Sequence, residues 1–104
     1  MTARIEIDKD RIAAFCRKWK ITRLSLFGSV LREDFGPDSD VDVLVAFAQE
    51  AHWGLFDLCH MEDELQEIFG RRVDLVSRRG IENSANYIRR RAILSSAETV
   101  HVAG

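Results

Sequence analysis

The sequence lacks the features that would assign it to a membrane or to a nucleic-acid template. It contains no apolar run near the ~20 residues that span a bilayer, and its first ten residues hold no apolar signal-peptide core. These absences predict a cytoplasmic protein that does not enter a membrane. Its 15 Lys and Arg do not outnumber its 17 Asp and Glu, and the formal net charge is −2. No overall positive field would therefore recruit a nucleic-acid template.

Cysteine is scarce as well. Cys16 and Cys59 stand outside any CxxC or Cys/His ligand spacing, which predicts two buried thiols of a reducing compartment rather than a disulfide or a zinc site. The three histidines lie in separate segments and also lack ligand spacing. A chain of 104 residues has room for one small core, so we expect residues 1–104 to form a single domain.

Helical periodicity appears in three segments. Apolar residues recur at helical spacing over residues 8–19, 53–69 and 81–94, which predicts three helices. The face expected to be buried in the last helix consists of Ile81, Ala85, Ile88 and Ala92. The acidic side chains expected to face solvent in the second helix are Glu62, Asp63, Glu64 and Glu67.

Strand-like patterns lie between these helices. Runs rich in β-branched and alternating apolar residues predict strands over residues 21–27, 41–47 and 71–77. The segment 98–102 is short and contains three β-branched residues, which predicts an edge strand at the end of the chain. Periodicity alone does not give the order of these strands in a sheet.

A Gly-Ser pair interrupts the chain directly after the first predicted strand. Gly28 and Ser29 are followed by a short helix-compatible run over residues 30–33. A strand, tight turn and helix start aim free backbone N–H groups and the positive end of a helix dipole at one point. The pair therefore predicts a phosphate-binding turn, in which Gly28 permits close approach and Ser29 adds a hydroxyl donor.

Two aspartates open the second predicted strand. Asp40 and Asp42 are two residues apart, so both carboxylates lie on one face of the strand. Their repulsion becomes attraction when a divalent cation lies between them, and hard oxygen ligands suit Mg²⁺. A calcium loop opening at Asp38 is disfavoured, because its sixth residue would be Val43 rather than Gly and its twelfth Gln49 rather than Glu.

The spacing of these two motifs resembles that of a known superfamily. Gly28-Ser29, ten intervening residues and Asp40-Val41-Asp42 resemble the signature of nucleotidyltransferases related to DNA polymerase β. The chain length and the phrase SDVDVLV resemble the minimal nucleotidyltransferase (MNT) group more narrowly. The resemblance implies an α/β (α+β) fold, with a small mixed sheet and helices packed mainly on one face.

The resemblance also implies a reaction and assigns roles to residues. The reaction is transfer of AMP from ATP to a hydroxyl, assisted by two Mg²⁺ ions. Asp40 and Asp42 would hold the ions, with Asp42 between them, while Gly28 and Ser29 would hold the β- and γ-phosphates. Arg32 follows the phosphate turn by about one helical turn, so it is a further candidate for contacting the triphosphate.

Asp74 is the third candidate ligand. It lies on one face of the predicted strand 71–77, beside Val76 and opposite Val73 and Leu75. An aspartate on such a half-buried face needs a partner, and by itself it is as readily a structural acid as a metal ligand. The segment GRRVDLV resembles the part of the family that carries the third acid, which implies that Asp74 completes the metal site on the acceptor side.

The resemblance finally implies a partner. Many MNT proteins are antitoxins of HEPN toxins, so the acceptor hydroxyl would be a toxin tyrosine. Two alternatives remain open: an antitoxin that inhibits by binding alone, and a nucleotidyltransferase of small molecules. Homo- and hetero-oligomers are both open. The arginines at 78–79 and 89–91 are more typical of solvated charge, although they could meet an acidic face of a partner.

Overall fold

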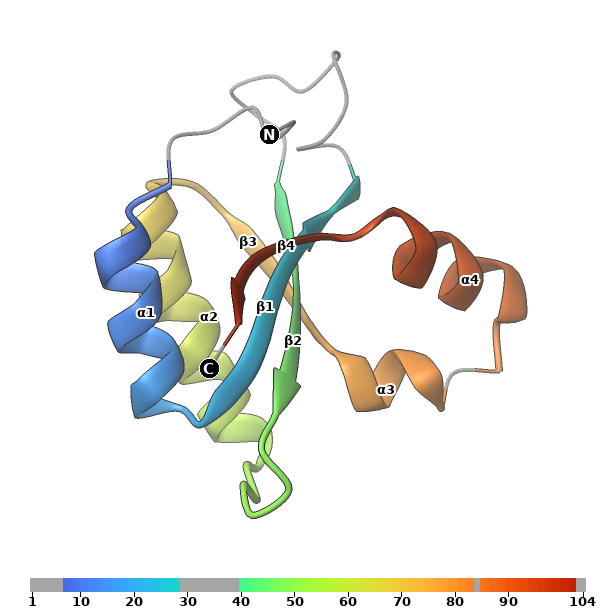
Figure 1. Cartoon of the computed structure of the whole chain (residues 1–104), viewed down its shortest axis with the longest axis horizontal. Helices are drawn as coiled ribbons and strands as arrows, with labels where there is room; N and C mark the ends of the chain where they lie inside the picture. Colours follow the sequence, from blue (N-terminus) through green and yellow to red (C-terminus); the bar gives the residue numbers. More distant parts are fainter. Residues whose placement is uncertain (1–6, 29–39, 84, 103–104) are drawn as a thin grey trace.

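Four strands form one mixed sheet (Figure 1). They are β1 (Ile21–Phe27), β2 (Val41–Phe47), β3 (Val73–Ser77) and β4 (Glu98–Val102), in the spatial order β3-β2-β1-β4. The pair β2–β3 is parallel, whereas β1 runs antiparallel to both β2 and β4. Three of the predicted strands are confirmed with their bounds, and the strand predicted over 71–77 begins two residues later. The predicted mixed sheet is therefore confirmed.

The computed structural model describes residues 7–28, 40–83 and 85–102. The short helix predicted over residues 30–33 lies outside these ranges. Within them, none of the helices is both long enough and apolar enough to cross a membrane.

Helices α1 (Lys9–Lys18) and α2 (Leu55–Phe69) agree closely with the prediction. Asp8 caps α1, since its carboxylate accepts a hydrogen bond of 3.2 Å from the backbone N–H of Arg11. Gly70 ends α2 in the left-handed conformation, at φ +71°, which a residue with a Cβ adopts only with strain. Local capping therefore sets the ends of both helices.

The predicted helix over 81–94 is wrong as a single element. The chain forms α3 (Arg78–Glu82) and α4 (Tyr87–Ser96) instead. Asn83 follows the last turn of α3, and Asn86 caps α4 by accepting from the backbone N–H of Arg89 at 3.0 Å. Asparagine side chains compete for backbone groups and favour caps over helix interiors, which explains the break.

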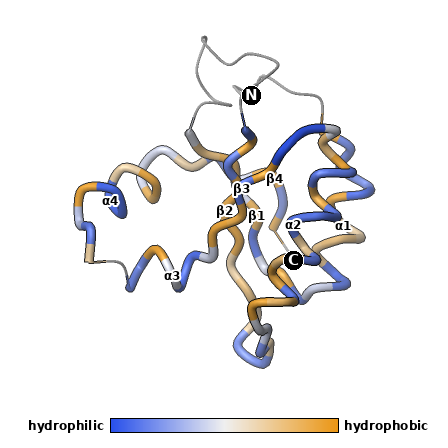
Figure 2. Tube along the Cα trace, turned by 180° about the vertical axis from the view of Figure 1, so that it is seen from behind, coloured by the Kyte–Doolittle hydropathy of each residue, from blue (hydrophilic) through white to orange (hydrophobic). Residues whose placement is uncertain are grey.

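The larger part of the core lies between the sheet and the pair α1 and α2. In Figure 1 these two helices cover one side of the sheet, and Figure 2 shows hydrophobic residues along β2, in the middle of that sheet. The residues of this core that are essentially inaccessible are Ile12, Cys16, Leu24, Leu26, Val41, Val43, Val45, Met61 and Leu65. The predicted packing of helices mainly on one face holds for this core.

A second, smaller cluster lies on the other face. Phe27 and Leu44 of the sheet pack there against Ile81 of α3 and Ile93 of α4. Figure 1 shows α3 and α4 on the side of the sheet opposite α1 and α2. Ile88, expected to be buried, is 80% exposed, because the break between α3 and α4 resets the helical phase.

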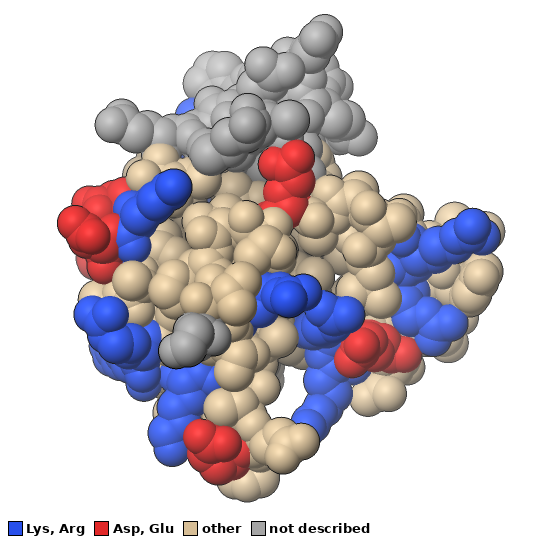
Figure 3. Space-filling view, in the orientation of Figure 1, with Lys and Arg blue, Asp and Glu red and all other residues tan. Residues whose placement is uncertain are grey.

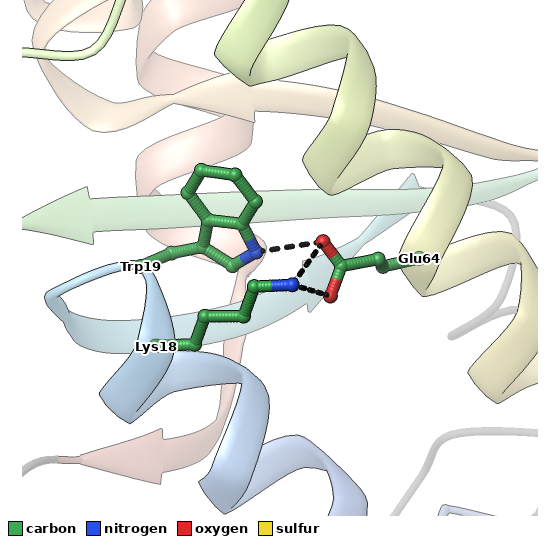
Figure 4. A network of polar contacts seen from close by, with 3 residues as sticks. All are labelled: Lys18, Trp19 and Glu64. Carbon is green, nitrogen blue, oxygen red and sulfur yellow. Dashed lines mark hydrogen bonds and ion pairs between the residues drawn. The ribbon is translucent and has the colours of Figure 1, made fainter.

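Glu64 departs from the solvent-facing role expected for it. Its carboxylate accepts from Lys18 Nζ at 3.0 and 3.1 Å and from Trp19 Nε1 at 3.0 Å (Figure 4). The Trp19 ring also meets Trp53 edge-on, with centroids 5.1 Å apart. The Glu64 contacts join the end of α1 to the middle of α2.

The prediction of two buried thiols is confirmed for Cys16 and wrong for Cys59, which is exposed.

Candidate active site

Asp42 and Asp74 lie side by side at one end of the sheet. They occupy the second positions of β2 and β3, and the parallel register pairs them directly. Because paired residues of adjacent strands point to the same face, both carboxylates share one face of the sheet. Asp74 is exposed and Asp42 is half-buried. The structure thus brings together two of the three predicted acids from segments about 30 residues apart in sequence.

Gly28 follows the neighbouring strand β1 and lies against Asp42. It follows Phe27, which pairs with Asp42 across β1 and β2, and its φ is +76°. A Cβ added at Gly28 would collide with Asp42 Oδ2 and lie 3.2 Å from Cγ. Glycine is therefore required at this position for two reasons, the positive φ of the backbone and the close approach of the Asp42 carboxylate.

Asp40 is placed differently from the other two acids. Its Oδ1 forms an ion pair of 3.2 Å with Arg72 Nε, and half of its side-chain surface is exposed. Val41, next to it, donates its backbone N–H to the Arg72 carbonyl at 2.9 Å. Among the described residues, no three His, Cys, Asp or Glu side chains gather closely enough to hold a metal ion. The joint role of Asp40, Asp42 and Asp74 as ligands stays a prediction.

Two predicted residues cannot be placed. Ser29 and Arg32 lie outside the described residues. The described Gly28 precedes them directly and stands against Asp42, so the start of the predicted phosphate turn is next to the carboxylates.

Sequence reasoning missed Arg72. Nothing in the spacing of Arg72 and Asp40, 32 residues apart, points to an ion pair, because the pair depends on β3 being the parallel neighbour of β2. A signal would be available only from the strand order. The exposed pair is worth about 0–1 kcal/mol, so a cation that binds Asp40 can displace it.

A cavity of about 570 Å³ lies at the opposite end of the same strands. Its lining includes Phe47 at the end of β2, Ser77 at the end of β3, and Trp53. The distance along β2 from Asp42 to Phe47 is about 17 Å at 3.3 Å per residue. This cavity is therefore separate from the carboxylate pair.

The profile of the nucleotidyltransferase domain family matches residues 10–97. The chain belongs to this family. Its matched region contains Gly28, Asp40, Asp42 and Asp74. Since the family consists of enzymes that transfer nucleotides, the prediction of a nucleotidyltransferase is confirmed at the level of the family.

Individual relatives place the chain within the nucleotidyltransferases. A solved structure described as a minimal nucleotidyltransferase is 32% identical, with a TM-score of 0.65, over 86% of this chain and 85% of that one. A candidate protein adenylyltransferase of Methanocaldococcus jannaschii is 35% identical over 66% of this chain and 72% of the relative. The predicted MNT group is therefore confirmed. The chain spans 65–66% of the length of other curated relatives, slightly under two thirds.

One complex shares the fold at lower identity. It contains a tri-AMPylated HEPN toxin of Shewanella oneidensis and an MNT antitoxin. The similarity has a TM-score of 0.63 at 21% identity, over 91% of this chain and 70% of the matched chain. At this identity the likeness shows the nucleotidyltransferase fold alone.

Proposed function

We propose that this nucleotidyltransferase transfers AMP from ATP to a hydroxyl of a HEPN toxin and thereby acts as its antitoxin. The observation that carries the proposal is the register pairing of Asp42 with Asp74, with Gly28 against Asp42. Two carboxylates beside a glycine turn are the groups that metal-assisted phosphoryl chemistry requires. The AMPylated toxin in the complex of similar fold supports the choice of acceptor.

The donor set fits Mg²⁺. Asp42 and Asp74 offer hard oxygen ligands on one face, and Asp40, two residues before Asp42 and paired with Arg72 at 3.2 Å, is a further oxygen donor. Asp40 and Asp42 would hold the two ions, and Asp74 would complete the site on the acceptor side. When bound, Mg²⁺ neutralises charge on the triphosphate and lowers the pKa of the acceptor hydroxyl.

The protein residues position the reactants. Gly28 opens the phosphate turn, where Ser29 and the backbone N–H groups hold the β- and γ-phosphates, with Arg32 as a further contact. Asp74, exposed at the edge strand β3, orients the incoming hydroxyl. The hydroxyl oxygen attacks the α-phosphorus, its proton is released, the bond to the bridging oxygen breaks, and pyrophosphate leaves. We propose a tyrosine as the acceptor, since AMP there adds charge and bulk that exclude RNA from a toxin.

The test uses ATP labelled at the α-phosphate, Mg²⁺ and the product of the neighbouring reading frame, which is the toxin of this proposal. Wild-type protein should label the toxin. Asp42→Asn keeps the size of the side chain but removes its charge, so labelling should fall by about 100-fold or more. Asp63→Asn, an equal change at an exposed position of α2, is the matched control and should label normally.

The second candidate is an antitoxin that inhibits by binding alone. It would be correct if Asp42→Asn bound and neutralised the toxin while neither protein transferred label. The clustered carboxylates favour the enzyme, because adjacent like charges destabilise a merely structural surface.

A further inference from the structure

Helices α3 and α4 differ in charge from the rest of the chain. Helices α3 and α4, called here the basic arm, contain five arginines and one acid, Glu82. Their formal charge of +4 leaves −6 for the remaining sequence, given the net charge of −2. Figure 3 shows Lys and Arg side chains gathered over these helices, at the right of the view. Such segregation produces a local positive field on an acidic protein.

Most of this charge is available to a partner. Arg78 Nε pairs with Glu82 at 3.3 Å, and Arg90 donates to the Glu82 carbonyl at 3.1 Å. The remaining arginines of the basic arm are all exposed, and within the described residues no carboxylate forms an ion pair with them; they are Arg79, Arg89 and Arg91.

Apolar surface lies among the arginines. Ile88 is 80% exposed and Tyr87 58% exposed on the first turn of α4. Ile88 is five residues from the buried Ile93, about 140° around the helix, so it points away from the sheet. Arg91 follows Ile88 by three residues and shares its side of the helix. Aromatic and Arg residues around an exposed aliphatic side chain are typical of protein interfaces, whereas contacts with phosphates alone would use only the arginines.

The basic arm stands beside the active site. Leu44 and Val76 pack with it through the smaller cluster, and they follow Asp42 and Asp74 by two residues on the same strands. The carboxylates therefore lie on the sheet face that the basic arm covers. Figure 1 shows the last turn of α4 nearest the sheet and its first turn farthest away. A protein docked on the first turn of α4, where Ile88 lies, would therefore reach the carboxylates by extending along the arm toward the sheet.

We propose that the basic arm docks an acidic surface of the protein that receives AMP, with Arg89 and Arg91 as charge contacts and Ile88 as the apolar contact. This inference rests on the function proposed above, because the docked protein is the substrate. In this proposal α3 and α4 recognise the acceptor protein, because the carboxylate end of the sheet offers little surface for that contact.

The test measures binding of the HEPN toxin without nucleotide, by calorimetry at two salt concentrations. The double variant Arg89→Glu, Arg91→Glu should bind about 10-fold more weakly or worse, and lose most of the salt dependence. Its matched control is Lys9→Glu, Arg11→Glu, an equal charge change at exposed positions of α1. The control should bind like wild type, and both variants should keep their helical circular dichroism and their affinity for Mg-ATP.

Ile88→Asn separates a protein partner from a nucleic acid. The side chain is exposed, so the fold should survive while toxin binding weakens several-fold. An arm whose arginines bound a 20-nucleotide RNA, with toxin affinity unchanged in both arm variants, would be a nucleic-acid site and would overturn the inference.

The remaining outcomes distinguish this inference from the proposed function. Toxin binding that depends on the arm, without any transfer of label, supports the docking surface and rejects the enzyme. Equal labelling and an equal KM for toxin in wild type and arm variant support the enzyme and reject the docking surface. A wild-type protein that neither binds nor labels the toxin rejects both.

Discussion

At the scale of single residues, Gly28 and Gly70 separate two demands that glycine meets. Both have positive φ, but a Cβ would meet Asp42 only at Gly28, and nothing within 4 Å at Gly70. Alanine at either position should lower the free energy of unfolding by about 1–2 kcal/mol through backbone strain. Gly28→Ala should also displace the Asp42 carboxylate and weaken Mg-ATP binding at least about 10-fold. Urea unfolding and calorimetry on both variants check this, and equal nucleotide affinities would contradict it.

The buried thiol gives a prediction about pH. Burial raises the pKa of Cys16 from 9.0 to about 11. Between these values the unfolded chain ionises before the folded one, so the stabilisation present below pH 9 is lost as pH rises through this window. The loss approaches about 3 kcal/mol, since each unit of pKa is worth 1.36 kcal/mol. Between pH 8 and 11 the free energy of unfolding should fall less steeply with pH for Cys16→Ala than for wild type. Cys59→Ala, at an exposed position, should keep the wild-type slope.

At the scale of elements, one carboxylate bridges the end of α1 and the middle of α2. Glu64 accepts from Lys18 and Trp19, whereas Glu67, one turn later, is exposed with no such contact among the described residues. Glu64→Ala should therefore lower the free energy of unfolding by about 1–2 kcal/mol, because the Trp19 indole N–H loses its acceptor. Glu67→Ala should change it by less than about 0.5 kcal/mol. Thermal unfolding compares the two, and equal losses would show that the contact adds no stability.

The same elements show what the sequence could predict. Strands 21–27 and 41–47 were predictable because β-branched and apolar residues define them locally. The break between α3 and α4 was missed, since the pattern from Ile81 to Ile88 suits one helix while the two asparagines act through caps. The order of strands, and with it the Asp40–Arg72 pair, depends on contacts between distant segments. Local patterns carry no information on such contacts.

The candidate site divides in the same way. The approach of Gly28 to Asp42 was predictable because both belong to one motif with a fixed spacing, whereas the role of Asp40 beside them stays a prediction. Asp74 needed the resemblance to a family, and its pairing with Asp42 needed the parallel register of β2 and β3. The exposed apolar residues of the basic arm were not predictable, because the phase of α4 depends on where the helix begins.

At the scale of the whole molecule, ligand binding should raise the stability of the fold only when metal and nucleotide are both present. Gly28, Asp42 and Asp74 lie at the ends of three neighbouring strands, β1, β2 and β3, so a ligand bound to all three residues would tie these strands together. A ligand at 100 times its dissociation constant stabilises the folded state by about 2.7 kcal/mol. Without Mg²⁺, the negative triphosphate is repelled by the neighbouring carboxylates and should bind poorly. Thermal unfolding should therefore shift upward with Mg-ATP, but not with ATP and a chelator, and Asp42→Asn should abolish the shift. Equal shifts of the unfolding temperature with and without chelator would show that nucleotide binding does not need a metal ion.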